Sequence, residues 1–294
     1  MENHTELLNI SIKTCSALSL LTVIFSICVY LKYKSFLPVF YRFVIATQLS
    51  CAINLIMKFI PSSDESCAVV GPVGTYGILS AVAWSGILAE KFYARHVYEE
   101  EISKNLPVCL FVAYGLTGIL AALPLFTDSY GQIGGYCWIK GDYSIIWRIF
   151  AYYLFVALSI IFTFRRYHLV IKAIKEDIQD LPNSSVLIEE KNSTFRRMRM
   201  YSVILLITFC PSLLYIIVDA LGAGNEYYEL ICMCFECLFA FFNTVVYLFK
   251  HDILLMVGNS LLCKKQEHEK NMSNFLTMEE KNADASALQD FSVI

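Results

Sequence analysis

The sequence has little charge and few of the residues that build enzyme sites. Only 17% of its 294 residues are Asp, Glu, Lys or Arg, and it holds 5 histidines and 13 glycines. It contains no glycine-rich phosphate loop, no His-Glu-x-x-His zinc pattern and no nucleophile elbow. These absences argue against an enzyme, and we expect no cofactor, no metal and no nucleic-acid partner.

Long apolar runs dominate what is present. Hydrophobic residues make up 57% of the chain, and the mean hydropathy is +0.55. A helix needs about 20 predominantly apolar residues to cross a bilayer core of roughly 30 Å. We therefore predict an all-α membrane protein, a seven-transmembrane helix bundle within residues 12–249. Its spans are expected at about 12–31, 38–60, 68–93, 106–126, 144–164, 200–222 and 228–249.

Basic residues in the short connections set the expected orientation. Loops rich in Lys and Arg face the cytoplasm, whereas acidic residues contribute little to topology. This pattern puts residues 1–11 outside the cell as a short extracellular N-terminus, and the C-terminus inside. The basic surface is expected to contact a partner protein or anionic lipid. Its candidate residues are Arg95, Arg165, Arg166, Arg196, Arg197 and Arg199.

The outer segment carries two sequons, at Asn3 and Asn9. Both asparagines are candidate glycosylation sites in a protein of the secretory pathway. We expect the protein to be a multi-pass protein of the plasma membrane.

Two of the eleven cysteines stand out from those inside the spans. Cys67 lies at the outer edge of the third span, and Cys137 lies in the outer loop before the fifth span. Both face an oxidising compartment, where a disulfide persists and would tie that loop across the mouth of the bundle. The alternative is two unpaired thiols. Trp138, beside Cys137, is expected at the membrane interface, where its ring is apolar and its N–H is hydrated.

Polar residues inside the apolar runs indicate an interior site, because ionisable groups in a bilayer face the bundle interior. Glu229, Glu236, Asn243 and Tyr247 fall on one face of the seventh span. The functional interpretation is an acidic outer pocket for a small, cationic ligand, and the alternative is a buried ion pair that only fixes packing. The candidate ligand-binding residues are Lys58, Tyr76, Trp138, Asp219, Glu229 and Glu236.

The C-terminal region is expected to form an amphipathic helix over residues 250–263 along the inner leaflet, then a disordered tail over 264–294. Cys263, beside two lysines, is a candidate palmitoylation site or a plain free cysteine. The last residues, Ser292, Val293 and Ile294, resemble a ligand for a PDZ domain, although such endings also arise by chance.

Three stretches carry a family resemblance: "GGYCWI" together with Cys67, "GILAEKFYA" closing the third span, and "FFNTVVYLF" in the seventh. Over residues 12–263 the chain resembles G protein-coupled receptors, and among them the slime-mould cAMP-receptor-like group and its secretin-like relatives. The resemblance implies ligand-driven opening of the cytoplasmic face and nucleotide exchange on a heterotrimeric G protein. It also implies an inner polar network of Arg42, Glu90, Tyr93, Asn243 and Tyr247.

Two departures accompany the resemblance. The histidine that secretin-like receptors place shortly after the basic residue of the second span is Ala46 here, and we expect no large hormone-binding ectodomain. A retinal-bearing pump would need a lysine midway along the seventh span, which has none before Lys250. The remaining alternative is a non-signalling seven-span protein that acts in trafficking or scaffolding through its tail.

Overall fold

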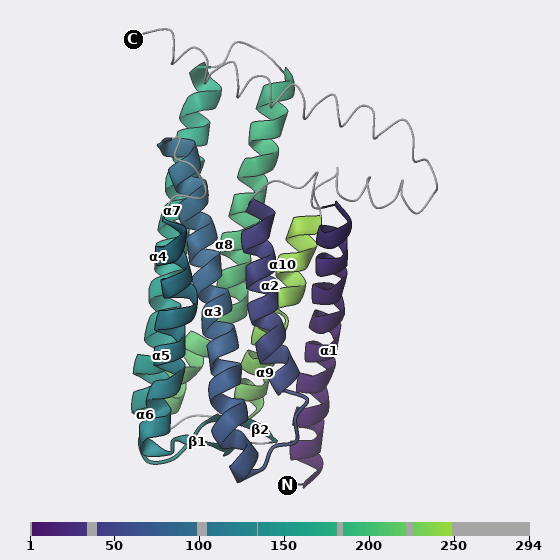
Figure 1. The fold of residues 1–294 in the computed structure, drawn as a ribbon, viewed down its shortest axis with the longest axis vertical. Coiled ribbons are helices and arrows are strands. Elements are labelled where there is room, and N and C mark those ends of the chain that lie inside the picture. Colours follow the sequence, from purple (N-terminus) through teal and green to yellow (C-terminus); the bar gives the residue numbers. More distant parts are fainter. Residues whose placement is uncertain are drawn as a thin grey trace, which may run out of the picture. The chain divides into compact units, whose positions relative to one another are not determined.

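The computed structural model describes the backbone of residues 2–33, 40–98, 105–133, 135–180, 185–221 and 226–248, which form mainly long helices (Figure 1). Side chains are described for most of these residues. The expectations for the helix at 250–263, the tail at 264–294, Cys263 and the C-terminal Ser292, Val293 and Ile294 lie outside the described residues.

Within the described residues, six helical segments are long and apolar enough to cross a membrane. The first lies within α1 (Glu2–Tyr33), the second and third are α2 (Phe40–Met57) and α3 (Asp64–Val97), and the last lies within α9 (Glu226–Cys237) and α10 (Phe239–Leu248). The long helix α8 (Ser185–Ala220) adds a shorter apolar stretch, Val203–Asp219. The molecule is therefore mostly helical, with six to seven apolar helices compatible with a membrane bundle.

The fourth and fifth segments each contain a wide helical turn. The fourth, residues 106–127, runs through α4 (Leu106–Leu110), the π-helical turn η1 (Phe111–Leu116), α5 (Thr117–Ala122) and the 3₁₀ turn η2 (Leu123–Thr127). The fifth, residues 144–180, runs through α6 (Ser144–Trp147), the π-helical turn η3 (Arg148–Tyr153) and α7 (Leu154–Asp180). A π turn inserts an extra residue and re-aims the side chains that follow, and such turns are frequent at functional sites.

The loop before the fifth segment is a β-hairpin, which the all-α prediction did not include. Strands β1 (Tyr130–Ile133) and β2 (Tyr136–Ile139) pair antiparallel, with Gln132 opposite Cys137. Gly135 makes the turn with a φ of 99°, a conformation that favours glycine. All four residues of β2 are buried, because the hairpin crosses the end of the bundle at which the chain begins (Figure 1).

Helix α3 is central and packs closely against α2. Its N-terminus is fixed by a capping box, in which Ser63 and Ser66 each accept a hydrogen bond from the other's backbone N–H. At Gly77 an added Cβ would come within 2.7 Å of the backbone nitrogen of Asn54 and 2.9 Å of the Ser50 carbonyl oxygen. Gly77 thus lets the backbones of α2 and α3 approach closely.

The last membrane segment has a one-residue interruption at Leu238, between α9 and α10, where Leu238 still donates to the Cys234 carbonyl oxygen at 3.0 Å. Two buried side chains from other helices bond to the backbone beside the break. Ser19 donates to the carbonyl oxygen of Cys237 at 2.6 Å, and Gln48 donates to the carbonyl oxygen of Ala240 at 3.4 Å and to the Thr244 hydroxyl at 2.9 Å. These bonds attach α1 and α2 to the segment at the point where its helix is interrupted.

Candidate functional site

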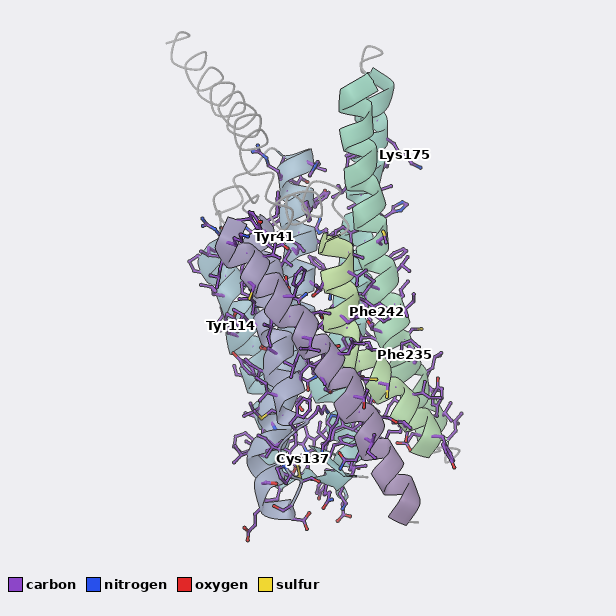
Figure 2. The ribbon with its side chains drawn as sticks, turned by 90° about the vertical axis from the view of Figure 1, so that its right-hand side faces the viewer. Tyr41, Tyr114, Cys137, Lys175, Phe235 and Phe242 are labelled. Carbon is purple, nitrogen blue, oxygen red and sulfur yellow. A yellow bond between two sulfur atoms is a disulfide. The ribbon has the colours of Figure 1, made fainter. Side chains whose placement is uncertain are left out.

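A disulfide between Cys67 and Cys137 ties the hairpin to the first turn of α3, as predicted. The two Cα atoms are 5.0 Å apart, and both cysteines are buried. Figure 2 shows Cys137 at the end of the bundle that carries the hairpin. Tyr130 of β1 packs its ring against Gly71 of α3 so closely that a side chain there would overlap it, and its hydroxyl donates to the Ala121 carbonyl oxygen at 2.8 Å. The hairpin is thus a fixed cover over the helix ends.

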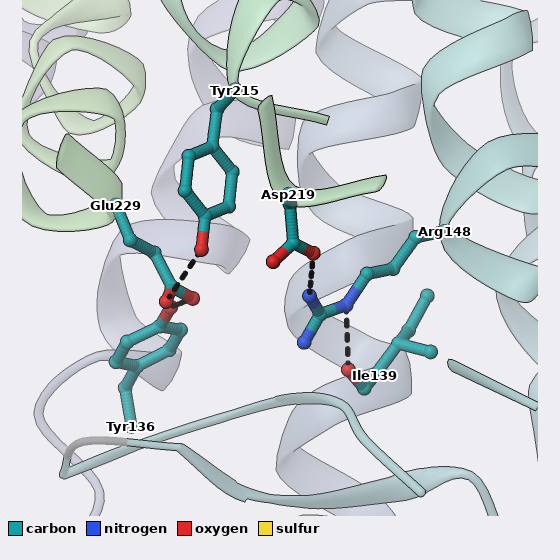
Figure 3. A network of polar contacts seen from close by, with 6 residues as sticks. All are labelled: Tyr136, Ile139, Arg148, Tyr215, Asp219 and Glu229. Atoms are coloured by element: carbon teal, nitrogen blue, oxygen red, sulfur yellow. Dashed lines mark hydrogen bonds and ion pairs between the residues drawn. The ribbon is translucent and has the colours of Figure 1, made fainter. Parts of the chain in front are cut away.

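The Glu229 carboxylate of α9 joins the hairpin to α8 (Figure 3). Tyr136 of β2 donates a hydrogen bond to Glu229 Oε1 at 2.5 Å, and Tyr215 of α8 donates to Oε2 at 3.4 Å. A short hydrogen bond to a carboxylate is among the stronger polar contacts in proteins.

Burial raises the pKa of Tyr136 well above its usual 10.0, and the nearby Glu229 carboxylate raises it further. The phenol therefore remains protonated and acts as the donor at neutral pH.

An ion pair connects η3 to α8 beside the hydrogen bonds of Glu229 (Figure 3). The Arg148 guanidinium lies 3.5 Å from Asp219 and donates to the Ile139 carbonyl oxygen of β2 at 3.0 Å. It also lies over the Trp138 ring, 4.7 Å from its centroid. One arginine thus contacts the hairpin backbone, an aromatic ring of the hairpin and a carboxylate of α8.

The π turn in the fifth segment directs two consecutive tyrosines inward. Tyr152 and Tyr153 are both buried, and both rings meet the Trp138 ring edge-on at centroid distances of 5.8 and 6.1 Å. In a regular helix neighbouring residues point about 100° apart, so burying both large rings is helped by the wider turn. The Tyr152 hydroxyl donates to Glu236 Oε2 at 3.0 Å, and Glu236 is only 7% exposed.

Below the hairpin lies a small cavity with a volume of about 20 Å³. Its wall includes two of the predicted charged residues, Lys58 and Glu236, together with Trp138. No ion pair joins Lys58 to Glu236 in the described part of the chain. The Lys58 ammonium instead lies over the Tyr136 ring, 4.9 Å from its centroid. A cavity of this size has room for about one water molecule.

Five of the six predicted ligand-site residues lie in these contacts or on the cavity wall, and Tyr76 does not. The Tyr76 ring faces Tyr114 in the fourth segment, with 6.5 Å between ring centroids. The sequence interpretation missed Tyr136, Tyr152 and Tyr215, and it missed Arg148. An isolated arginine at the start of an apolar run was a usable signal, because a charge placed there needs an interior partner.

At the opposite ends of the helices, Arg166 of α7 bonds to Glu90 of α3 at 2.6 Å. The same guanidinium lies 4.5 Å from the Tyr93 ring centroid and 5.2 Å from that of Phe162. The pair is partly exposed, with side-chain exposures of 28% for Arg166 and 38% for Glu90. Arg166, predicted as a contact for a partner protein, thus holds α3 and α7 together.

The other predicted residues at this end are less connected. Arg42, Arg95 and Arg165 are exposed. The Asn243 side chain is buried, and its amide nitrogen has no hydrogen-bond partner among the described residues. The side chains of Tyr247, Arg196, Arg197 and Arg199 are outside those that the structure describes.

The two predicted glycan sites both fall in α1. Asn9 is half-buried and lies against the hairpin turn at Gly135, which leaves little room for a glycan, whereas the side chain of Asn3 is not described. No group of His, Cys, Asp and Glu in the described ranges has the arrangement of a metal site.

No family model matches the chain. It is similar to the Frizzled and smoothened-like protein Q of Dictyostelium discoideum, with 24% identity over 188 residues. These residues are 62% of this chain and 30% of that protein, so the chain spans less than a third of its relative's length. The match points to a receptor-like membrane protein of the G protein-coupled-receptor-like class. It does not single out the cAMP-receptor-like or secretin-like group.

Proposed function

We propose that the protein is a plasma-membrane receptor with seven spans, in which a small extracellular ligand acts at the hairpin end and a heterotrimeric G protein binds at the opposite end. In this proposal the N-terminus is extracellular and the C-terminus cytoplasmic, as the distribution of Lys and Arg predicts.

The observation that carries the proposal is the network in Figure 3. Strand β2 contacts η3 through Arg148 and α9 through Glu229, and these two residues in turn bond to Asp219 and Tyr215 of α8. A ligand that competes for these contacts changes how the helix ends are held. Because α7 and α8 are long continuous helices, a tilt at the hairpin end moves their opposite ends as well.

The contact between Arg166 and Glu90 supports the second half of the proposal. The ion pair holds α3 against α7 at the end where a G protein would bind. Because both side chains are partly hydrated, separating them costs little free energy. Exposed Arg95 and Arg165 lie in the same region and offer positive charge to a partner or to anionic lipid headgroups. The α8 arginines Arg196, Arg197 and Arg199 are proposed to extend this basic surface.

The test is G protein dissociation in cells that express the chain at a measured surface level, screened against amines, amino acids, peptides and lipids. The proposal predicts a response that Glu236→Gln weakens without lowering surface expression, while the exposed control Lys140→Met leaves it unchanged. Complete silence, including no basal activity at normal surface expression, would contradict receptor signalling. That result would favour the alternative of a scaffold acting through its tail and a PDZ-domain partner.

A further inference from the structure

The cavity below the hairpin carries both signs of charge on its wall. Lys58 follows the end of α2, and Glu236 comes from the middle of the seventh segment. Each is held by an aromatic residue and not by the other: the ammonium lies over Tyr136, and the carboxylate accepts from Tyr152. A buried charge that lacks an opposite charge in contact is costly, so both groups retain capacity for a charged partner.

Further polar groups on the same wall are also available. Asn54 is 6% exposed and Thr75 is 4% exposed, and both line the cavity. The Thr75 hydroxyl oxygen lies near the Tyr130 phenol but has no partner in hydrogen-bonding geometry among the described residues. Buried polar groups of native proteins are normally hydrogen-bonded, to protein, water or ligand. The Thr75 hydroxyl can therefore bind a polar guest.

The cavity is too small for most ligands as it stands, but part of its wall can adapt. About 20 Å³ accommodates one water molecule. Met57 and Met233 line it, and methionine is unbranched and repacks readily. Lys58 is half-buried and directly follows α2, and its long flexible side chain can move outward as a guest enters. The disulfide keeps Cys137 in place, so expansion occurs at these side chains and not by loss of the hairpin.

We propose that this cavity binds a small zwitterion of the amino-acid type, with the ligand ammonium at Glu236 and the ligand carboxylate at Lys58. The inference rests on the proposed function for its biological role and names the ligand class of that site. A simple amine would neutralise Glu236 and leave Lys58 without an anion, and a simple carboxylate would do the reverse. The site therefore favours a zwitterion over an amine or a carboxylate, because a ligand with a single charge leaves either Lys58 or Glu236 without an opposite charge.

The test is binding to the purified full-length chain, measured by thermal unfolding and by calorimetric titration. The probes are glycine, β-alanine and 4-aminobutyrate, which separate the two charges by increasing lengths, with ethylamine and propionate as single-charge controls. A zwitterion of the fitting length is expected to bind about tenfold more tightly than either control. Binding of the amine or of the acid alone with equal affinity would overturn the proposal.

Single substitutions test the contributions of Lys58 and Glu236 separately. Lys58→Met and Glu236→Gln are each expected to weaken zwitterion binding by about tenfold or more and to abolish its advantage over one single-charge control. Thr75→Val changes no charge and is expected to weaken binding only a few-fold, so it tests the site even if a charge variant fails to fold. Lys140→Met and Asp142→Asn, both exposed, are the matched controls and should bind like the wild type.

The outcomes also separate this proposal from receptor function. Zwitterion binding without G protein dissociation would sustain the site and contradict signalling. Signalling driven by some other compound, with no zwitterion binding to the wild type, would refute the zwitterion site and leave the proposal of receptor function standing.

Discussion

The contact between Tyr136 and Glu229 yields a prediction whose size follows from the geometry. Tyr136→Phe removes the hydroxyl that donates to Glu229 at 2.5 Å and keeps the ring beneath the Lys58 ammonium. A hydrogen bond to a charged group is worth about 1.5–3 kcal/mol. Because Glu229 is only half-buried and retains Tyr215 as a donor, we expect a loss of about 1–2 kcal/mol.

The assay is a double-mutant cycle with Tyr136→Phe and Glu229→Gln, read as the free energy of unfolding of the purified chain in one detergent. The expected coupling energy is about 1 kcal/mol, and each kcal/mol lowers the melting temperature by about 2–4 °C. Tyr215→Phe is the matched control: its bond to the same carboxylate is 3.4 Å long, so it should cost less than half as much. If the two variants are additive, or if Tyr215→Phe costs more than Tyr136→Phe, the network does not fasten the hairpin as described.

Three further predictions concern the disulfide, the opposite end of the bundle and pH. Replacing Cys67 and Cys137 by alanine should lower stability by roughly 2–4 kcal/mol and make it insensitive to reductant; unchanged unfolding would show that the bridge adds nothing. Arg166→Gln should raise basal G protein dissociation by releasing α3 from α7, as should Glu90→Gln; lowered basal activity in both would refute a closing role. Because the pKa of Tyr136 is raised in the folded protein, its contribution is fully present below pH 10.0 and is lost as the pH rises through the folded value. Tyr136→Phe should therefore lose less stability than the wild type in alkaline titration, and identical curves would contradict this assignment.

The apolar segments were predictable because bilayer thickness sets a minimum length that the sequence displays directly. The disulfide was predictable too, since Cys67 and Cys137 flank spans at the same predicted face. The hairpin was missed because each strand has four residues, and "GGYCWI" with its glycines has the composition of a loop. The π turn at η3 leaves no periodicity signal, so the inward direction of both Tyr152 and Tyr153 required the structure.

Of the candidate site, only the charged residues could be predicted from the sequence. Carboxylates such as Glu236 stand out in an apolar run, because burying them without a function or a partner is costly. The partners of Glu229 and Glu236 are tyrosine hydroxyls from distant parts of the sequence, such as Tyr152 for Glu236, and these tyrosines carry no distinguishing pattern. Lys58 forms no ion pair with a carboxylate among the described residues and lies over the ring of Tyr136. Such pairings depend on how the helices pack, which spacing along one helix does not determine.

The central claim is that the chain crosses the membrane with the hairpin outside and the tail inside. Epitope tags on the two ends, and a labelling cysteine in place of exposed Asp142 beside the hairpin, test it most directly in intact cells. With this orientation, the N-terminal tag and the cysteine should react with impermeant reagents before permeabilisation, and the C-terminal tag only afterwards. Finding both tags on the same side, or the labelling cysteine protected in intact cells, would contradict it.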